Sequence, residues 1–222
     1  MLFETPGDDL EPAATLALDF TTAERKRASQ VEPTQIIIGR ARRRPLALPD
    51  GGMFKPGERY DVLQLACSFV PGRDSHVDWA RFRVEIRSEA DDVDDPIAVD
   101  LSPLEVTQPQ ELELSINFEP KVAFGAFSAS LGSLSTKVQS VRVLPVTIAG
   151  GLNANTVYWQ MQQTAEHPIA GARAFYALLS IPREEVPITV TCGAVVDIRS
   201  EKGTFRAATH EHRNVPGLVQ HL

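Results

Sequence analysis

Residues 80–87 read ARFRVEIR, and this stretch decides the fold class. Every second position is apolar, namely Ala80, Phe82, Val84 and Ile86, and the positions between them carry arginine or glutamate. Because successive side chains of a β-strand point to opposite faces, the pattern predicts a strand with one buried and one solvated face. Residues 111–118 alternate in the same way, with leucine, isoleucine and phenylalanine at the even positions.

Further strands are predicted on both sides of this stretch. The segments around Cys67 and Cys192 alternate clearly, and less regular candidates are 15–20, 34–40, 97–106, 122–131, 138–148, 156–163, 173–181 and 204–208. Turn residues separate them, for example Pro71-Gly72 and Gly150-Gly151. Many short strands at this spacing favour a sandwich or barrel over a parallel sheet that alternates with helices.

We therefore predict an all-β fold, an antiparallel β-sandwich of the immunoglobulin-like or jelly-roll-like kind, with one short N-terminal helix. Thr21 and Glu24 have the spacing of a capping box, and good helix formers follow as far as Gln30. The expected organisation is an N-terminal arm and helix over residues 1–58, a sandwich over 59–208 and a polar C-terminal tail over 209–222. A division into two smaller sandwiches near residue 107 is the alternative.

The cysteines and a tryptophan give limited support to the sandwich. Cys67, Trp79 and Cys192 follow the order in which immunoglobulin domains place a cysteine, a tryptophan and a second cysteine. The chain departs from that family at Val190, where a tyrosine is expected, and in the long separation of the two cysteines. Both cysteines lie on apolar strand faces, which predicts unreactive core thiols.

Charge is distributed unevenly along a chain whose net charge is −7. Residues 24–60 contain nine Lys/Arg and four Asp/Glu, whereas residues 89–120 contain ten acids and no base. The strongest basic cluster is Arg40, Arg42, Arg43 and Arg44, and in an extended segment alternate members share one face. We take this cluster as a candidate binding surface, although the lack of interleaved aromatic residues argues against a nucleic-acid partner.

Two groups of residues are candidate metal ligands. Asp91, Asp92, Asp94 and Asp95 are clustered in a predicted loop and offer the oxygen ligands that calcium prefers, without the glycine of an EF-hand loop. His210 and His212 have the spacing that places two imidazoles on one side of a strand, but no third ligand is evident nearby.

Tyr158 and Gln160 are candidate surface contacts for a partner. On a strand they lie opposite the face that Val157, Trp159 and Met161 share, and the latter three are expected in the core.

Residues 122–131 are mostly small and carry no charge, which makes them the candidate segment for membrane insertion. Phe124 and Phe127 fall on opposite faces of a single strand there, so the segment does not fit a lipid-facing pattern.

No sequence motif for nucleophilic catalysis, phosphate binding or dinucleotide binding occurs. We therefore predict a non-catalytic binding or assembly module that acts through protein–protein contacts, including self-association, and that uses no cofactor. Nucleic acid and membrane are not expected partners. The N-terminus lacks the basic and apolar regions of a signal peptide, which predicts a cytoplasmic protein. The alternatives are a hydrolase or metal-dependent enzyme using the loop carboxylates or the His-x-His pair, and a membrane-active pore-forming protein.

Overall fold

The computed structural model describes residues 11–46, 58–90, 92–106, 113–115, 137–139, 146–164, 168–182, 187–214 and 216–218. The predicted all-β class is confirmed, because most of these residues lie in strands and two large, mainly antiparallel sheets hold nearly all of the strands. The described part of the chain contains one helix, α1 (Thr22–Ala28). Thr21 and Glu24 contact each other at its start, where the Thr21 hydroxyl donates to the Glu24 carboxylate and the Glu24 amide donates to the Thr21 carbonyl. These two bonds differ from the reciprocal side chain–backbone bonds of the predicted capping box.

The first sheet is built around β5 (Arg59–Val70) and β13 (Gly171–Ile181), and we call it the β5–β13 sheet. Its strand order is β1 (Pro12–Leu16), β3 (Gln35–Gly39), β5, β13 and β7 (Ile97–Ser102). β4 (Arg42–Pro45) also pairs with β5, and β17 (Gly217–Leu218) pairs with β4 in parallel.

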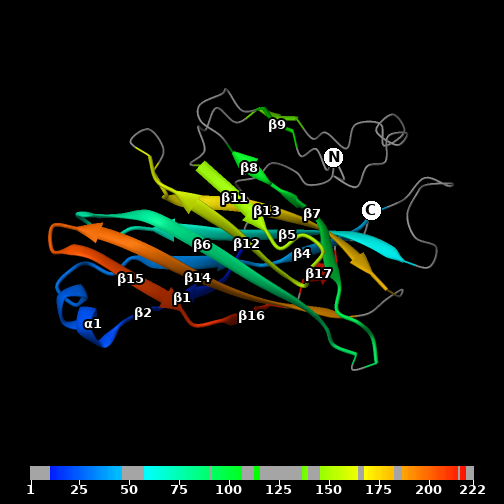
Figure 1. Ribbon diagram of the computed structural model, residues 1–222, viewed down its shortest axis with the longest axis horizontal. Helices are drawn as coiled ribbons and strands as arrows, with labels where there is room; N and C mark the ends of the chain where they lie inside the picture. The colour runs from blue at the N-terminus through cyan, green and yellow to red at the C-terminus, as the bar shows by residue number, and fades with distance from the viewer. Residues whose placement is uncertain are drawn as a thin grey trace.

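The second sheet is built around β6 (Ser75–Ser88) and β14 (Ile188–Ser200), and we call it the β6–β14 sheet. Its order is β2 (Leu18–Phe20), β15 (Gly203–Thr209), β14, β6, β12 (Thr156–Gln162), β11 (Val146–Gly150) and β8 (Glu105–Val106). β16 (His212–Asn214) pairs with β14 beyond the end of β15. Figure 1 shows β6, β14 and β15 running along the length of the molecule, with α1 at one end.

The core lies between the two sheets because each contributes its apolar face. Phe82 of β6, Trp159 of β12 and Phe175 of β13 form its aromatic centre, with the Trp159 and Phe175 ring centroids 4.8 Å apart. The Trp159 indole nitrogen donates to the Pro103 carbonyl at 3.1 Å, which satisfies its one polar group. The apolar positions of the β6 alternation all face this core, since Ala80, Phe82, Val84 and Ile86 are fully buried.

Several predicted strands divide differently in the structure. Residues 15–20 contribute to β1 and β2, which belong to different sheets, and residues 97–106 are divided between β7 and β8 in the same way. β6 pairs with β12 and β14, and the described part of the predicted strand 111–118, Glu113–Ser115, pairs with Lys137–Gln139 instead. Residues 122–131 lie outside the described residues.

The division into arm, sandwich and tail stays a prediction. The structure places strands from both end regions inside the two sheets. β1, β3 and β4 from the expected arm join the β5–β13 sheet, and β16 and β17 from the expected tail pair with β14 and β4.

Candidate functional site

One edge of the β6–β14 sheet is formed by two strands that a long stretch of chain connects. β8 pairs antiparallel with β11, with Val106 opposite Thr147 and Glu105 opposite Ile148. The chain leaves the sheet after Val106 and rejoins it at Val146. Residues 107–145 are therefore inserted between two neighbouring strands at the sheet edge.

Within that insertion, β9 (Glu113–Ser115) and β10 (Lys137–Gln139) pair with each other. Among the described residues they pair with no strand of the two large sheets, and Figure 1 shows β9 beyond β8 and β11. Their antiparallel register places Leu114 opposite Val138. Leu114 lies eight residues after Val106, and Val138 lies nine residues before Thr147. The β9–β10 pair therefore continues the register of the β8–β11 pair to within one residue.

The outer face of β12 carries the predicted surface residues Tyr158 and Gln160 beside arginine and tryptophan from β6. Gln160 lies opposite Arg81, and its Oε1 accepts a hydrogen bond from the Arg81 guanidinium at 2.7 Å. The Arg81 guanidinium lies 4.8 Å from the Tyr158 ring centroid and 5.5 Å from that of Trp79. Arg206 of β15 covers the Trp79 ring at 5.2 Å, so the two aromatic residues and two arginines form one continuous row.

Gly150 allows the Tyr158 ring to lie in this position. Gly150 and Tyr158 are opposite each other in the β11–β12 register. A Cβ atom on Gly150 would overlap the Tyr158 hydroxyl and the ring carbon that bears it. The absence of a side chain at this position therefore helps to place Tyr158 against Arg81.

The arginine cluster at residues 40–44 is divided by the fold. Arg40 is exposed and pairs with Glu11 at 3.2 Å, and Arg42 is half-buried. Arg43 and Arg44 are buried, and Arg43 donates from Nε to the fully buried carboxylate of Asp61. Arg59 donates to the other Asp61 oxygen at 2.7 Å, so both oxygens of this buried carboxylate are paired with arginines. The expected single surface of Arg40, Arg42, Arg43 and Arg44 does not form.

The acidic loop after β6 has a visible structural role at one position. Asp95 accepts from the Ser88 amide at 2.9 Å with one oxygen and from the Asn155 side chain at 2.8 Å with the other. Asp92 and Asp94 are exposed, and Asp91 lies outside the described residues. Asp95 thus joins the end of β6 to the turn before β12.

The two histidines, His210 and His212, have different neighbours. His210 precedes β16 and contacts Asp19 at 2.8 Å, whereas His212 lies on β16 opposite Cys192. In the described ranges, no group of three histidine, cysteine, aspartate or glutamate side chains is placed to hold a metal ion.

Both cysteines are buried and free, and neither has the environment of a nucleophile. Burial raises the pKa of Cys192 to about 12 and raises the pKa of Cys67 well above its ordinary value, with the nearby Cys192 adding to the effect. The thiolate form is therefore disfavoured at neutral pH.

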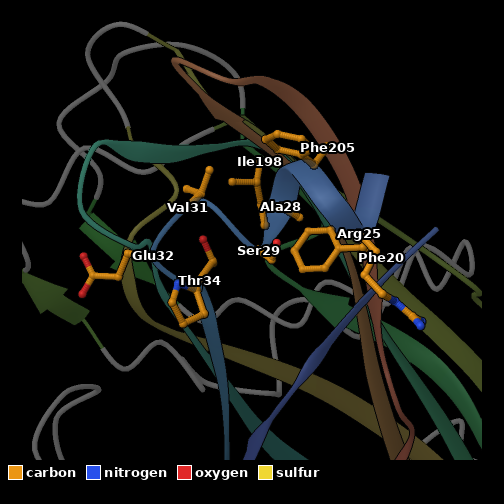
Figure 2. A pocket seen from close by; sticks show the side chains of 10 residues that line it. Phe20, Arg25, Ala28, Ser29, Val31, Glu32, Thr34, Ile198 and Phe205 are labelled. Atoms are coloured by element: carbon orange, nitrogen blue, oxygen red, sulfur yellow. The ribbon is translucent and has the colours of Figure 1, made fainter. Parts of the chain in front are cut away.

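A cavity of about 320 Å³ lies between α1 and the end of the sandwich (Figure 2). Apolar side chains make up most of its wall, including Phe20, Ala28, Ile198 and Phe205. Arg25 and Glu32 lie at its margin, and the Glu32 carboxylate accepts from the Arg73 amide at 2.6 Å. Its other polar lining residues are Ser29 and Thr34.

Sequence reasoning missed Trp79, Arg81 and Arg206 as members of the row. A signal for two of them is present, because Trp79 and Arg81 continue the wet face of the 80–87 alternation. Arg206 lies far away in sequence and reaches Trp79 only because β14 lies between β6 and β15.

No described helix is long and apolar enough to cross a membrane.

Comparisons with known proteins give weak structural similarities. No family model matches the chain, and no curated protein matches it. A solved structure described as a pore forming protein is 11% identical, covers 90% of this chain and 93% of its own, and superimposes with a TM-score of 0.38. Clostridium perfringens delta-toxin is 10% identical, with 82% and 86% coverage and a TM-score of 0.39. Similarities at this level assign neither fold nor function.

Proposed function

We propose that this protein is a membrane-active, pore-forming protein that inserts residues 107–145 into a bilayer as a β-hairpin. The observation that carries the proposal is that the registers of β8–β11 and β9–β10 agree to within one residue. An insertion whose two ends are neighbours at a sheet edge, and whose interior strands pair within one residue of the same register, has the connectivity of a hairpin that prolongs that edge.

The residue pattern of the insertion supports the proposal. In the β9–β10 register an apolar pair, Leu114 and Val138, stands between two polar pairs, Glu113 with Gln139 and Ser115 with Lys137. Residues 111–118 continue the same alternation in sequence. Alternating apolar and polar positions are the signature of a strand that faces lipid on one side and an aqueous lumen on the other.

The length of the insertion is sufficient for two crossings. A tilted transmembrane β-strand needs about 9–11 residues. Residues 107–145 provide two such strands and a connecting turn. Since an open sheet edge is not tolerated in lipid, hairpins from several copies must pair into a closed barrel. The predicted assembly through protein–protein contacts is therefore part of this proposal.

The sequence-based objection to insertion assumed that residues 122–131 form one strand. Continuing the register in which Leu114 is opposite Val138 puts the turn of an inserted hairpin near residue 126. Phe124 and Phe127 would then belong to the two ends of a turn, where strict alternation is not required.

Single-cysteine labelling tests the proposal directly. Each residue from Glu111 to Phe118 is replaced in turn by cysteine and labelled with a polarity-sensitive dye; the buried native thiols do not compete. After addition of vesicles loaded with a quenched dye, we expect leakage together with a blue shift at the even positions and little shift at the odd positions.

Labelling at exposed Arg40, far from the insertion in sequence, is the matched control and should give no shift. Absence of leakage with equal shifts at even and odd positions would overturn the proposal, because an inserted strand must separate its two faces.

A further inference from the structure

The outer face of the β6–β14 sheet carries a concentration of exposed arginines that the proposed insertion does not use. β6 contributes Arg81, Arg83 and Arg87 to this arginine face, and β14, β15 and β16 contribute Arg199, Arg206 and Arg213. All six are exposed. They come together because antiparallel pairing places the polar positions of neighbouring strands on the same side.

Three of the ion pairs on this face are layered, with the guanidinium group outside and the carboxylate beneath it. The Arg87 side chain is 64% exposed and its partner Glu85 17%. Arg199 is 60% exposed against 19% for Asp78, and Arg206 is 62% exposed against 21% for Asp197. A ligand that approaches the sheet meets the positive groups first, although each pair is formally neutral.

The carboxylates orient the arginines and keep their charge. Arg206 donates from two nitrogens to the two oxygens of Asp197, at 2.6 and 2.7 Å. Hydrogen bonding to Asp197 raises the pKa of Arg206, and hydrogen bonding to Glu85 raises that of Arg87. The outward edges of these guanidinium groups stay available for a second set of acceptors.

Aromatic side chains lie among the arginines. Trp79 and Tyr158 are half-buried next to Arg81 and Arg206, in the row described above. Arginine together with tryptophan and tyrosine is the composition found where proteins meet lipid headgroups, since these side chains combine an apolar body with a polar end.

We infer that the arginine face is a docking surface for bilayers that contain anionic phospholipids. Guanidinium groups match phosphate oxygens in geometry, and a broad sheet face suits a planar surface of headgroups. The inference rests on the proposed function for its membrane context. Lipid binding and leakage are measured separately, so either can fail alone.

Co-sedimentation with phosphatidylcholine vesicles, with and without phosphatidylserine, tests the inference. We expect the full chain to bind strongly only when phosphatidylserine is present, and to lose binding as salt rises. Each arginine near an anionic surface contributes about fivefold to affinity. Arg199→Gln and Arg206→Gln together should therefore weaken binding by about twentyfold or more, whereas Arg199→Lys with Arg206→Lys should retain most of it.

Two further variants make the test specific. Glu211 is the most exposed acid among these pairs, with 58% of its side chain accessible next to Arg83, so Glu211→Gln should strengthen binding. Arg40→Gln removes an exposed arginine from the link between β3 and β4, away from the arginine face, and should leave binding unchanged. Thermal unfolding confirms that each variant is folded.

Equal binding to both vesicle types would overturn the inference, as would an equal loss of binding in Arg40→Gln. Binding to a soluble polyanion such as heparin with no binding to phosphatidylserine vesicles would also overturn it. If variants of the arginine face lose vesicle binding while the dye-labelled hairpin shows no alternation, the docking surface stands and the pore-forming proposal fails.

Discussion

The two cysteines illustrate how burial fixes chemistry at single residues. Both thiols lie in the core, and burial raises the pKa of Cys192 to about 12. A disulfide reagent at pH 8 should therefore modify neither thiol in the native protein and both in urea, measured by absorbance. Because the native state holds these protons more tightly than the unfolded state, stability should fall as pH rises above about 8.5, the ordinary thiol value. Rapid native-state modification at pH 8 would contradict this picture.

Individual functional residues were only partly predictable from sequence. The placement of Tyr158 and Gln160 opposite a buried Trp159 follows from alternation alone, which is a local property. The burial of Arg43 depends on β4 pairing with β5, which brings Asp61 beside it from another strand. No pattern within residues 40–44 reports that partner, so the sequence suggests an exposed cluster where the structure has a buried ion pair.

At the level of strands, the contact between β11 and β12 depends on a residue without a side chain. Gly150→Ala places a methyl group in the space of the Tyr158 ring. We expect a loss of about 1–3 kcal/mol in the free energy of unfolding, typical of overpacking, and weaker vesicle binding as the Arg81 row is displaced. Urea unfolding and co-sedimentation measure the two effects.

Gly193→Ala on β14 is the matched control for that substitution. Its new Cβ would lie 3.7 Å from Glu211 and Thr209, which is ordinary van der Waals contact. A similar loss of stability in both variants would show that any side chain at a strand glycine is harmful, and would remove the specific role of Gly150.

The sequence predicts the existence of strands better than their division between sheets. Alternation in 80–87 gives β6 and its buried face correctly. Residues 97–106 are predicted as one strand, yet β7 joins one sheet and β8 the other. Which sheet a strand joins is decided by distant partners, β13 for β7 and β11 for β8, and not by its own composition.

For the molecule as a whole, the sandwich and the insertion are expected to be separable. Every residue of the main hydrophobic core in the described part of the chain lies outside 107–145. Replacing residues 107–146 by an Asn-Gly turn that joins Val106 to Thr147 should leave the sandwich folded and abolish vesicle leakage. Circular dichroism and dye release provide the two measurements, and leakage by the shortened protein would contradict the proposed function.

The pairing of β2 with β15 has a consequence for the order of events during synthesis. Phe20 lies opposite Ala207, so the second strand of the chain cannot complete its sheet until almost all of the protein has been made. At about 5–20 residues per second, the N-terminal region waits roughly ten to forty seconds for its partner. Such non-local pairing slows folding, and it leaves early strand edges exposed to neighbouring nascent chains. Refolding yield should therefore fall as protein concentration rises.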